Sequence, residues 1–523
     1  MKAFLMYSEQ DFDLQGKLPW NEEALLQDLE LTTLFNAMAL GDKFLFEVAK
    51  KAVLTSLTGL DAIRYRQAIL EDCLKNSSVV RELYTIAVQA IENEKKNYFS
   101  IFIKYPSVIL HTSIEVLEMF VGMLKKLRQV ADEHATKFES QGFTRFFGML
   151  EQELDDNYFA IVQEHLKELK FRGGVLISAE LGKGNKGINY VLRKSQDKKQ
   201  NWLQELLGPK PPGYTFYISE RDESGLRALS DLQDRGINLV ANALAQSTSH
   251  ILSFFNMLKT ELAFYVGCLN LHQKLVQMGE VVSFPLPVAS NERRHSFSGL
   301  YDVCLALSLS ERVVGNSVNA DNKNLVVITG ANQGGKSTFL RSIGLSQLMM
   351  QCGMFVPAKS FCTNICEGLF THYKREEDTS MSSGKLDEEL SRMSEIVDSL
   401  KSNSLVLFNE SFAATNEREG SEIARQIIQA LLEKQVKVFF VTHLYEFAHG
   451  LYEQKRVNEI FLRAERQSDG SRTYKLREGE PLQTSYGEDL YSRIFETDRQ
   501  VTFNDTWIRE RRPFPDGSTG FEL

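Results

Sequence analysis

A glycine-rich segment carries the clearest chemical pattern in this sequence. Residues 330–337 read Gly-Ala-Asn-Gln-Gly-Gly-Lys-Ser, and they lie between the apolar run 325–329 and a helical pattern over 338–343. In this G-x-x-x-x-G-K-S context, backbone N–H groups surround phosphates at the positive end of a helix. We expect Lys336 to contact the β- and γ-phosphates of a nucleotide and Ser337 to bind Mg²⁺. The expected nucleotide contacts here are Gly330, Asn332, Gly334, Gly335, Lys336, Ser337 and Thr338.

Two further apolar runs end in polar side chains that could complete such a site. Residues 404–408 lead into Asn409 and Glu410. Glu410 could orient or deprotonate an attacking water, whereas Asn409 offers the magnesium shell an oxygen without the negative charge of the usual aspartate. We therefore expect weak magnesium binding or slow turnover. Residues 436–442 end at His443, which could sense the γ-phosphate, although a lone histidine is also common as a structural residue.

These segments need a sheet that brings their carboxyl ends together. From Pro285 onward the sequence alternates short apolar strands with helices, which is typical of an α/β sheet. Residues 213–284 contain no proline and carry apolar residues at three-to-four spacing, which predicts long helices spanning on the order of 100 Å if continuous. The same period over 116–130 and 146–162 predicts partner helices, so we expect two long helical arms.

The segment between the arms has a different composition. Residues 171–217 are rich in glycine and contain β-type runs at 175–177 and 188–192, which predicts a small β-rich tip. A cluster of basic residues there could contact the phosphate backbone of a duplex without reading its sequence, and a solvated loop is the alternative. The basic residues are Lys183, Lys186, Arg193, Lys194, Lys198 and Lys199.

Length and composition limit the class of protein. The 523 residues exceed one hydrophobic core, and 43% hydrophobic with 25% charged residues excludes a disordered or fibrous chain. A formal net charge of −9 means that any contact with nucleic acid must be local. The six cysteines contain no C-x-x-C pair, so we expect buried thiols. No apolar run approaches the roughly 18 residues of a membrane span, and we expect a cytoplasmic protein without a membrane partner.

Taken together, the motifs resemble the MutS family of DNA mismatch-repair ATPases. The resemblance rests on residues 329–338, 356–358, 409–420, 442–443 and 485–487. It implies an ATPase with ATP and Mg²⁺ as cofactors. It also implies a multidomain α and α/β fold, in which a helical core with long lever helices and a small β-rich clamp is followed by a P-loop NTPase domain of the ABC/MutS type.

By this resemblance, two protomers form a homodimer with ATP at composite sites, and the nucleotide state opens or closes the arms around DNA. ATP can do so only if it binds one arrangement more tightly than the other. Asn316 lies where such proteins hold the base. The expected domains are a helical core (1–105), outgoing lever helices (106–170), the β-rich clamp (171–217), returning lever helices (218–284), and the ATPase domain with a C-terminal dimerisation region (285–523).

Three departures from the family pattern shape the expected function. The sequence begins in the helical core, so we expect no mismatch-reading domain and no reading of single mismatches. Asn409 replaces the usual aspartate. The signature loop that reaches the partner's nucleotide should fall within 380–389 but lacks its usual Ser-Thr-Phe core, which leaves Ser382 and Ser383 as candidates for that contact. A polar loop capping the helix near Leu386 is the alternative. We also expect no appended nuclease domain.

The leading hypothesis is an ATP-dependent DNA-binding protein of the MutS type, which hydrolyses ATP to switch a dimeric clamp on DNA in repair or recombination. Branched or recombination DNA is the expected substrate, and the expected partner is DNA, duplex or branched. The alternative is a nucleotide-dependent protein clamp or scaffold that does not act on DNA directly, which is consistent with the acidic net charge. A kinase-like transferase is a third reading, for which the sequence offers no acceptor pocket.

Overall fold

The computed structural model describes residues 1–97, 105–172, 174–194, 217–219, 221–375, 384–467 and 470–483. Several expected features therefore lie outside the described residues, namely Lys198, Lys199, Ser382, Ser383 and residues 485–487. The chain divides into two compact units. The first comprises residues 1–289, 303–313 and 345–365, and the second comprises 290–302, 314–344 and 366–523. The expected domain boundaries stay predictions.

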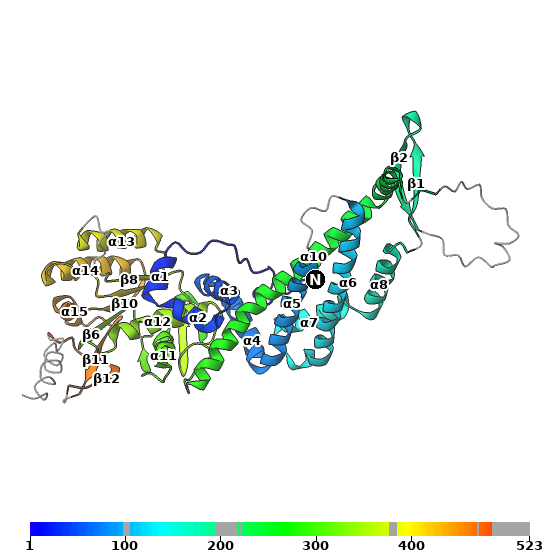
Figure 1. The fold of residues 1–523 in the computed structure, drawn as a ribbon. Helices are drawn as coiled ribbons and strands as arrows, with labels where there is room; N and C mark the ends of the chain where they lie inside the picture. The colour runs from blue at the N-terminus through cyan, green and yellow to red at the C-terminus, as the bar shows by residue number, and fades with distance from the viewer. Residues whose placement is uncertain are drawn as a thin grey trace, which may run out of the picture. The chain divides into compact units, whose positions relative to one another are not determined.

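The first unit is mostly helical. One helix of 55 residues, α10 (Glu223–Gln277), dominates it and is about 80 Å long at ~1.5 Å per residue. It runs beside α5 and α6, with the rings of Phe120 and Phe255 stacked 5.6 Å apart (Figure 1). The other elements are α1 (Glu22–Asp28), α2 (Leu31–Ala39), α3 (Lys43–Leu54), α4 (Leu60–Lys75), α5 (Ser77–Asn97), α6 (Pro106–His134), α7 (Gln141–Glu153), α8 (Asp156–Leu169), β1 (Leu176–Leu181), β2 (Gly187–Arg193), β3 (Leu286–Val288), α11 (Val303–Leu309) and β7 (Ser360–Asn364).

A β-hairpin packs near the first turns of α10. Strands β1 and β2 pair antiparallel, with Leu176 opposite Arg193. A Cβ atom at Gly236 of α10 would lie 2.4 Å from Ile177 Cδ1, so glycine permits β1 to approach the helix closely. The two β-type runs expected from the sequence thus form paired strands.

Helix α6 is longer and more apolar than expected from the sequence. The stretch Pro106–Lys137 is long and apolar enough by composition to cross a bilayer, which corrects the expectation that no run approaches that length. Half of its most apolar window is buried in the structure, and the core helix of a folded domain meets the same criterion. The buried side, which includes Phe120, packs against α10. All six cysteines are thiols, and Cys362 alone among them is not fully buried.

The N-terminal segment is held by buried polar side chains of distant helices. Glu261 of α10 has no exposed surface, and its carboxylate accepts hydrogen bonds from the backbone N–H groups of Leu5 (2.6 Å) and Phe12 (3.2 Å). Arg66 of α4 is equally buried and donates from Nε to the Met6 carbonyl at 2.8 Å. Burial raises the pKa of Glu261 to about 7, against the opposing effect of backbone N–H donors at Leu5, Phe12 and Met6.

This buried carboxyl predicts a pH-dependent stability. The folded state holds the Glu261 proton up to a pKa of about 7, whereas the unfolded chain releases it near the ordinary value of about 4.3. Stability should therefore fall as the pH rises through this window, by up to about 3 kcal/mol. Glu261→Gln removes this titration, so the loss of stability across the window, measured by urea unfolding, should be smaller in the variant than in the wild type. An equal loss in the variant and the wild type would contradict the assignment.

The second unit is built on a six-stranded sheet with the order β12-β11-β6-β10-β9-β8. Neighbouring strands from β11 to β8 are parallel, and β12 is an antiparallel edge strand. The elements of this unit are β4 (His295–Leu300), β5 (Asn316–Asn319), β6 (Leu325–Gly330), α12 (Lys336–Gln351, whose last residues belong to the first unit), β8 (Leu369–Tyr373), α13 (Lys385–Ser399), β9 (Leu405–Asn409), α14 (Glu417–Glu433), β10 (Lys437–Val441), α15 (Tyr445–Tyr452), β11 (Glu459–Arg466) and β12 (Arg472–Glu478).

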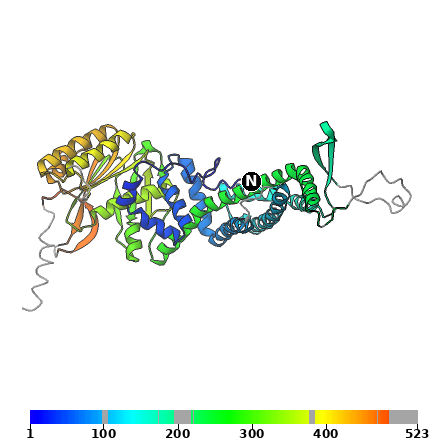
Figure 2. The same cartoon turned by 45° about the horizontal axis from the view of Figure 1, so that its top comes forward.

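Both faces of this sheet are covered. Helices α13, α14 and α15 share one hydrophobic core with β6, β9 and β10, and Figure 2 shows α13 and α14 in yellow and orange over the strands. On the other side of β10, the ring of His295 lies 5.0 Å from that of Phe439. Burial on both faces explains why these strands read as unbroken apolar runs. The expectation of a fold with many helices and α/β sheets is confirmed.

Candidate functional site

The glycine-rich segment forms a loop between β6 and α12. Gly330 and Gly335 have φ angles of +112° and +85°, in the left-handed region that side chains with a Cβ atom rarely adopt. Lys336 begins α12, is 5% exposed, and donates from Nζ to the carbonyl oxygens of Gly330 and Ala331 at 3.1 Å each. Burial lowers the pKa of Lys336 to about 8. The loop therefore holds a partly desolvated cation at the start of a helix, an arrangement suited to an anionic phosphate group.

A hydroxyl and an amide meet beside this loop. Ser337 Oγ donates to Asn409 Oδ1 at 2.9 Å, so residues 72 positions apart in the sequence are in contact. Asn409 is the last residue of β9, and Thr338 follows Ser337 in the first turn of α12. Hydroxyl and amide oxygens are among the hard ligands that Mg²⁺ accepts, usually with several waters and substrate phosphates. The donor set fits magnesium, and Ser337 and Asn409 would hold it.

A carboxylate and an imidazole lie at the ends of the two neighbouring strands. Glu410 Oε1 is 3.2 Å from His443 Nε2, and both side chains are about one-third exposed. The hydrogen bond from His443, followed by nearby positive charges that include Lys336, lowers the pKa of Glu410 despite its partial burial. Glu410 is therefore ionised at neutral pH and can accept a proton or orient a water. The backbone N–H of Glu410 donates to the Val441 carbonyl at 2.9 Å, which fixes β9 to β10 here.

The backbone around Glu410 is strained. Glu410 and Phe412 have φ angles of +55° and +62°, although neither is glycine. A non-glycine residue with a left-handed φ angle destabilises the fold by on the order of 1–3 kcal/mol. Such a conformation persists only where surrounding contacts hold it. Gly420 is one such contact point, because a Cβ atom there would lie 2.4 Å from the Phe412 carbonyl oxygen. Strain of this kind gathers at functional sites, which supports a chemical role for Glu410.

Strand β12 contributes residues that the sequence did not suggest. Arg472 donates from Nε to the Asn332 carbonyl at 3.3 Å, and its charge is close enough to help lower the pKa of Lys336. Tyr474 has a φ of +58° and lies beside Gly335. Neither residue belongs to a local motif, so no sequence signal marked them. Their contacts with the loop, together with the unusual φ of Tyr474, make both residues candidates for nucleotide contact.

Asn316 has a structural task in this unit. Its side chain is 5% exposed, donates to the Tyr474 carbonyl at 3.1 Å and accepts from the Leu476 N–H at 2.8 Å. The amide thus joins β5 to β12 and supports the strand that carries Arg472 and Tyr474. Its expected contact with the base stays a prediction.

The described part of the basic cluster lies on the β1–β2 hairpin and just after it. Lys183, Lys186, Arg193 and Lys194 are all exposed. Arg193 Nε donates to Ser178 Oγ at 2.9 Å, and Lys194 Nζ pairs with Glu168 at 2.7 Å. The hairpin thus presents cations to solvent, one of them already paired with a carboxylate.

Two family models match the chain. The model described as MutS2 N-terminal domain matches residues 58–278, and the model described as MutS domain V matches residues 326–501. The second match includes the loop between β6 and α12, Asn409, Glu410 and His443. The two matches do not overlap and follow the order of helical and α/β parts in the sequence.

Curated relatives agree with these matches. MutS protein homolog 4 of Homo sapiens is 29% identical over 198 residues, which are 36% of this chain and 21% of that protein. DNA mismatch repair protein MutS of Prochlorococcus marinus is 25% identical over 327 residues, 60% of this chain and 35% of the relative. The Thermotoga maritima protein of the same name is 34% identical over 165 residues, 31% of this chain and 21% of the relative. The matched part spans only about a fifth to a third of these relatives. The family models and these relatives agree that the chain belongs to the MutS family.

Proposed function

We propose that the chain is a DNA-binding ATPase of the MutS type, which hydrolyses ATP to switch a homodimeric clamp on DNA in repair or recombination. One observation carries the ATPase part: Lys336 and Ser337 lie at the same sheet edge as Asn409, Glu410 and His443. Binding sites of parallel α/β sheets lie at the carboxyl ends of the strands, and these residues lie at or just after those ends. We place this activity in the cytoplasm, without a membrane partner.

Each residue has a task in the proposed reaction. The backbone N–H groups of the glycine loop and Lys336 would neutralise the phosphates. Ser337 and Asn409 would hold Mg²⁺, which would supply further positive charge to the phosphates. Glu410 would orient the attacking water and accept its proton, while His443 keeps the carboxylate ionised and directed. Purified protein should release phosphate from ATP without any added acceptor. A requirement for an added acceptor would instead favour a transferase.

Because Asn409 is uncharged, we expect hydrolysis to need a high concentration of Mg²⁺. A negative charge at this position should lower that concentration. Asn409→Asp places a carboxylate 2.9 Å or so from Ser337 Oγ, at the position of the present amide oxygen. We expect the magnesium concentration that half-saturates hydrolysis to fall about tenfold, because a charged oxygen is the better ligand for a hard cation. A titration of hydrolysis rate against Mg²⁺ measures this. Superimposable curves would mean that another carboxylate already supplies the charge.

Glu417, the acidic residue next along the chain, has a different task. Its Oε1 accepts hydrogen bonds from the backbone N–H groups of Tyr445 (2.8 Å) and Glu446 (3.3 Å) at the start of α15. A carboxylate at a helix N-terminus is stabilised there. Glu417→Gln is therefore expected to leave the magnesium titration unchanged, which makes it the control for Asn409→Asp.

The basic hairpin supports the DNA part of the proposal. Its exposed cations lie at both ends of the strands, Lys183 and Lys186 at the turn and Arg193 and Lys194 at the opposite end, on a chain with a net charge of −9. These cations would bind the phosphate backbone through release of counterions, so the affinity would depend on salt but hardly on sequence. The names of the bacterial relatives refer to DNA mismatch repair. We propose branched or recombination DNA as the substrate, without reading of single mismatches.

Neutralising the described cations of the hairpin tests this part. Changing Lys183, Lys186, Arg193 and Lys194 to alanine should weaken duplex binding. It should also flatten the slope of log affinity against log salt by about 0.9 for each phosphate that the protein no longer neutralises. The matched control changes the exposed residues Lys401, Arg418, Lys434 and Lys455, with an equal change in net charge. DNA affinity that is the same in both variants would favour the second candidate, a nucleotide-dependent protein clamp or scaffold.

The choice of DNA is tested with gel shifts on a four-way junction, a looped duplex, a duplex with one mismatch and a plain duplex. The proposal expects the junction or the loop to bind most tightly. A clear preference for the single mismatch would contradict the proposed substrate while leaving the proposed ATPase activity standing.

A further inference from the structure

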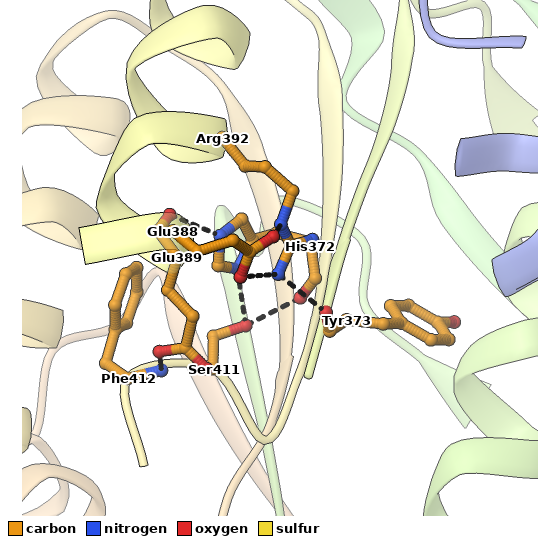
Figure 3. A network of polar contacts seen from close by, with 7 residues as sticks. All are labelled: His372, Tyr373, Glu388, Glu389, Arg392, Ser411 and Phe412. Atoms are coloured by element: carbon orange, nitrogen blue, oxygen red, sulfur yellow. Dashed lines mark hydrogen bonds and ion pairs between the residues drawn. The ribbon is translucent and has the colours of Figure 1, made fainter. Parts of the chain in front are cut away.

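A buried polar network lies next to the turn of residues 410–412, called the Glu410 turn below, and none of its members was among the site residues expected from the sequence (Figure 3). His372 on β8 and Ser411 both have no exposed surface. The imidazole Nδ1 is 2.7 Å from Ser411 Oγ, and Nε2 is 2.9 Å from the backbone carbonyl oxygen of Glu389. Ser411 Oγ also lies 2.6 Å from the His372 carbonyl oxygen. One imidazole thus connects β8, the residue after Glu410, and helix α13.

Helix α13 holds the same turn from a second side. The Glu389 carboxylate, 3% exposed, accepts a hydrogen bond from the Phe412 N–H at 2.8 Å. Arg392, one turn along, donates from Nη2 to the Tyr373 carbonyl at 3.0 Å and so attaches α13 to β8. The rings of His372 and Phe412 stack 5.2 Å apart at an angle of 21°. Both residues that follow Glu410 are therefore fixed by side chains of β8 and α13, as the dashed lines in Figure 3 show.

The protonation of His372 fits a fixed arrangement. Burial lowers its pKa to about 4, so the ring is neutral at pH 7 and has one donor and one acceptor nitrogen. Nε2–H must donate to the Glu389 carbonyl, which leaves Nδ1 to accept from Ser411. The single hydroxyl proton of Ser411 has two acceptors, Nδ1 and the His372 carbonyl oxygen. When one member of such a buried network is removed, several other buried groups lose their hydrogen-bond partners. The network is therefore fully satisfied in only one backbone geometry.

That geometry decides where the Glu410 carboxylate points. Glu410 and Phe412 adopt left-handed φ angles on either side of Ser411, a conformation that needs outside support. The support comes from His372 at Ser411 and from Glu389 at Phe412. Because Glu410 is covalently next to Ser411, a shift of α13 or β8 would turn its carboxylate.

We propose that His372, Ser411 and Glu389 are positioning residues, which hold the Glu410 turn for hydrolysis and convey the placement of α13 to it. The inference rests on the proposed ATPase function. Helix α13 begins at Lys385, two residues after Ser383, in the sequence region expected to face a partner's nucleotide. The network therefore acts on the hydrolysis step, whereas nucleotide affinity depends on the loop between β6 and α12.

The central test is Ser411→Ala, which removes one hydroxyl and little volume. The catalytic constant for ATP hydrolysis should fall about tenfold, because small displacements of a reacting group have large effects on rate. The dissociation constant of a non-hydrolysable ATP analogue should stay within about twofold, a split that general destabilisation would not produce. Ser421→Ala is the matched control, since Ser421 Oγ is buried on α14 and has no hydrogen-bond partner within the described ranges. It should hydrolyse ATP at the wild-type rate.

Two further comparisons keep the test decisive if one variant folds poorly. Glu389→Gln retains an oxygen that can accept from the Phe412 N–H, and it should hydrolyse faster than Glu389→Ala. The double variant of His372→Phe with Ser411→Ala should be hardly slower than the slower single variant, because residues of one network are not additive. Losses of hydrolysis rate that add up in the double variant would contradict the proposed network. Equal hydrolysis rates in Glu389→Gln and Glu389→Ala would also contradict it.

The outcomes separate this inference from the proposed function. Wild-type protein that binds ATP but releases no phosphate would overturn both. Wild-type hydrolysis together with an unchanged catalytic constant in Ser411→Ala would overturn the positioning role alone. A rise in the dissociation constant that accounts for the whole loss of activity would also overturn it, because the network would then act on binding.

Discussion

Lys336→Ala should abolish ATP hydrolysis and weaken nucleotide binding on the order of a hundredfold, the effect expected when a charge-assisted hydrogen bond to phosphate is removed. The physical reason is the position of Nζ, which is almost buried and lies between the carbonyl oxygens of Gly330 and Ala331 at the start of α12. Burial already lowers its pKa to about 8, so the protein tolerates a costly cation there. Calorimetric titration with ATP and with ADP measures the loss.

The control for this variant is Lys434→Ala, which removes an exposed lysine after α14. It should bind ATP as the wild type does. Lys336→Ala should also remain folded, since removing a desolvated charge costs the fold little, and thermal unfolding checks this. Unimpaired hydrolysis by Lys336→Ala would remove the basis of the nucleotide site, and with it the proposed function.

The loop between β6 and α12 was predictable because its signal is local. Residues 325–343 contain the strand, the glycines, the lysine and the helix in one stretch, and the structure places β6, the loop and α12 there. Asn409, Glu410 and His443 come from distant segments. Their meeting followed from a rule of parallel sheets, since the ends of β6, β9 and β10 share one edge.

The sequence predicted that a long helix forms here but not where the helix begins and ends. Absence of proline and a regular apolar period indicated helix over 213–284, and α10 occupies 223–277 of that range. Its contacts were not predictable. Glu261 binds backbone groups about 250 residues earlier, and a buried carboxylate inside an apolar helical pattern gives no sequence sign of its partners.

The parts of the site that sequence reasoning missed depend on backbone conformation. Ser411 and His372 have ordinary neighbours in the sequence, and only the left-handed φ angles of Glu410 and Phe412 bring the hydroxyl to the imidazole. Arg472 reaches the loop between β6 and α12 because β12 returns antiparallel beside β11. Non-glycine residues rarely adopt positive φ, so no propensity could have marked these turns.

Glu410→Gln is the second substitution with a large expected effect. The amide keeps the size of the side chain and the strained backbone of residue 410, but it cannot accept a proton. If Glu410 activates the attacking water, the catalytic constant should fall by about 10²–10⁴, the usual contribution of a general base. ATP should still bind, because Lys336 and the glycine loop remain. Single-turnover hydrolysis and a binding titration on the same sample separate the two effects.

The behaviour of His443 completes this test. Its Nε2 lies 3.2 Å from Glu410 Oε1, and the hydrogen bond is the main cause of the lowered pKa of that carboxyl. His443→Ala should therefore slow hydrolysis less than Glu410→Gln and shift the acidic limb of the rate profile to higher pH, since an unsupported carboxylate protonates more easily. Adding His443→Ala to Glu410→Gln should cost little more, because the histidine acts through the carboxylate. The control is Glu433→Gln, which should hydrolyse ATP at the wild-type rate. If Glu410→Gln does so as well, another group must be the general base.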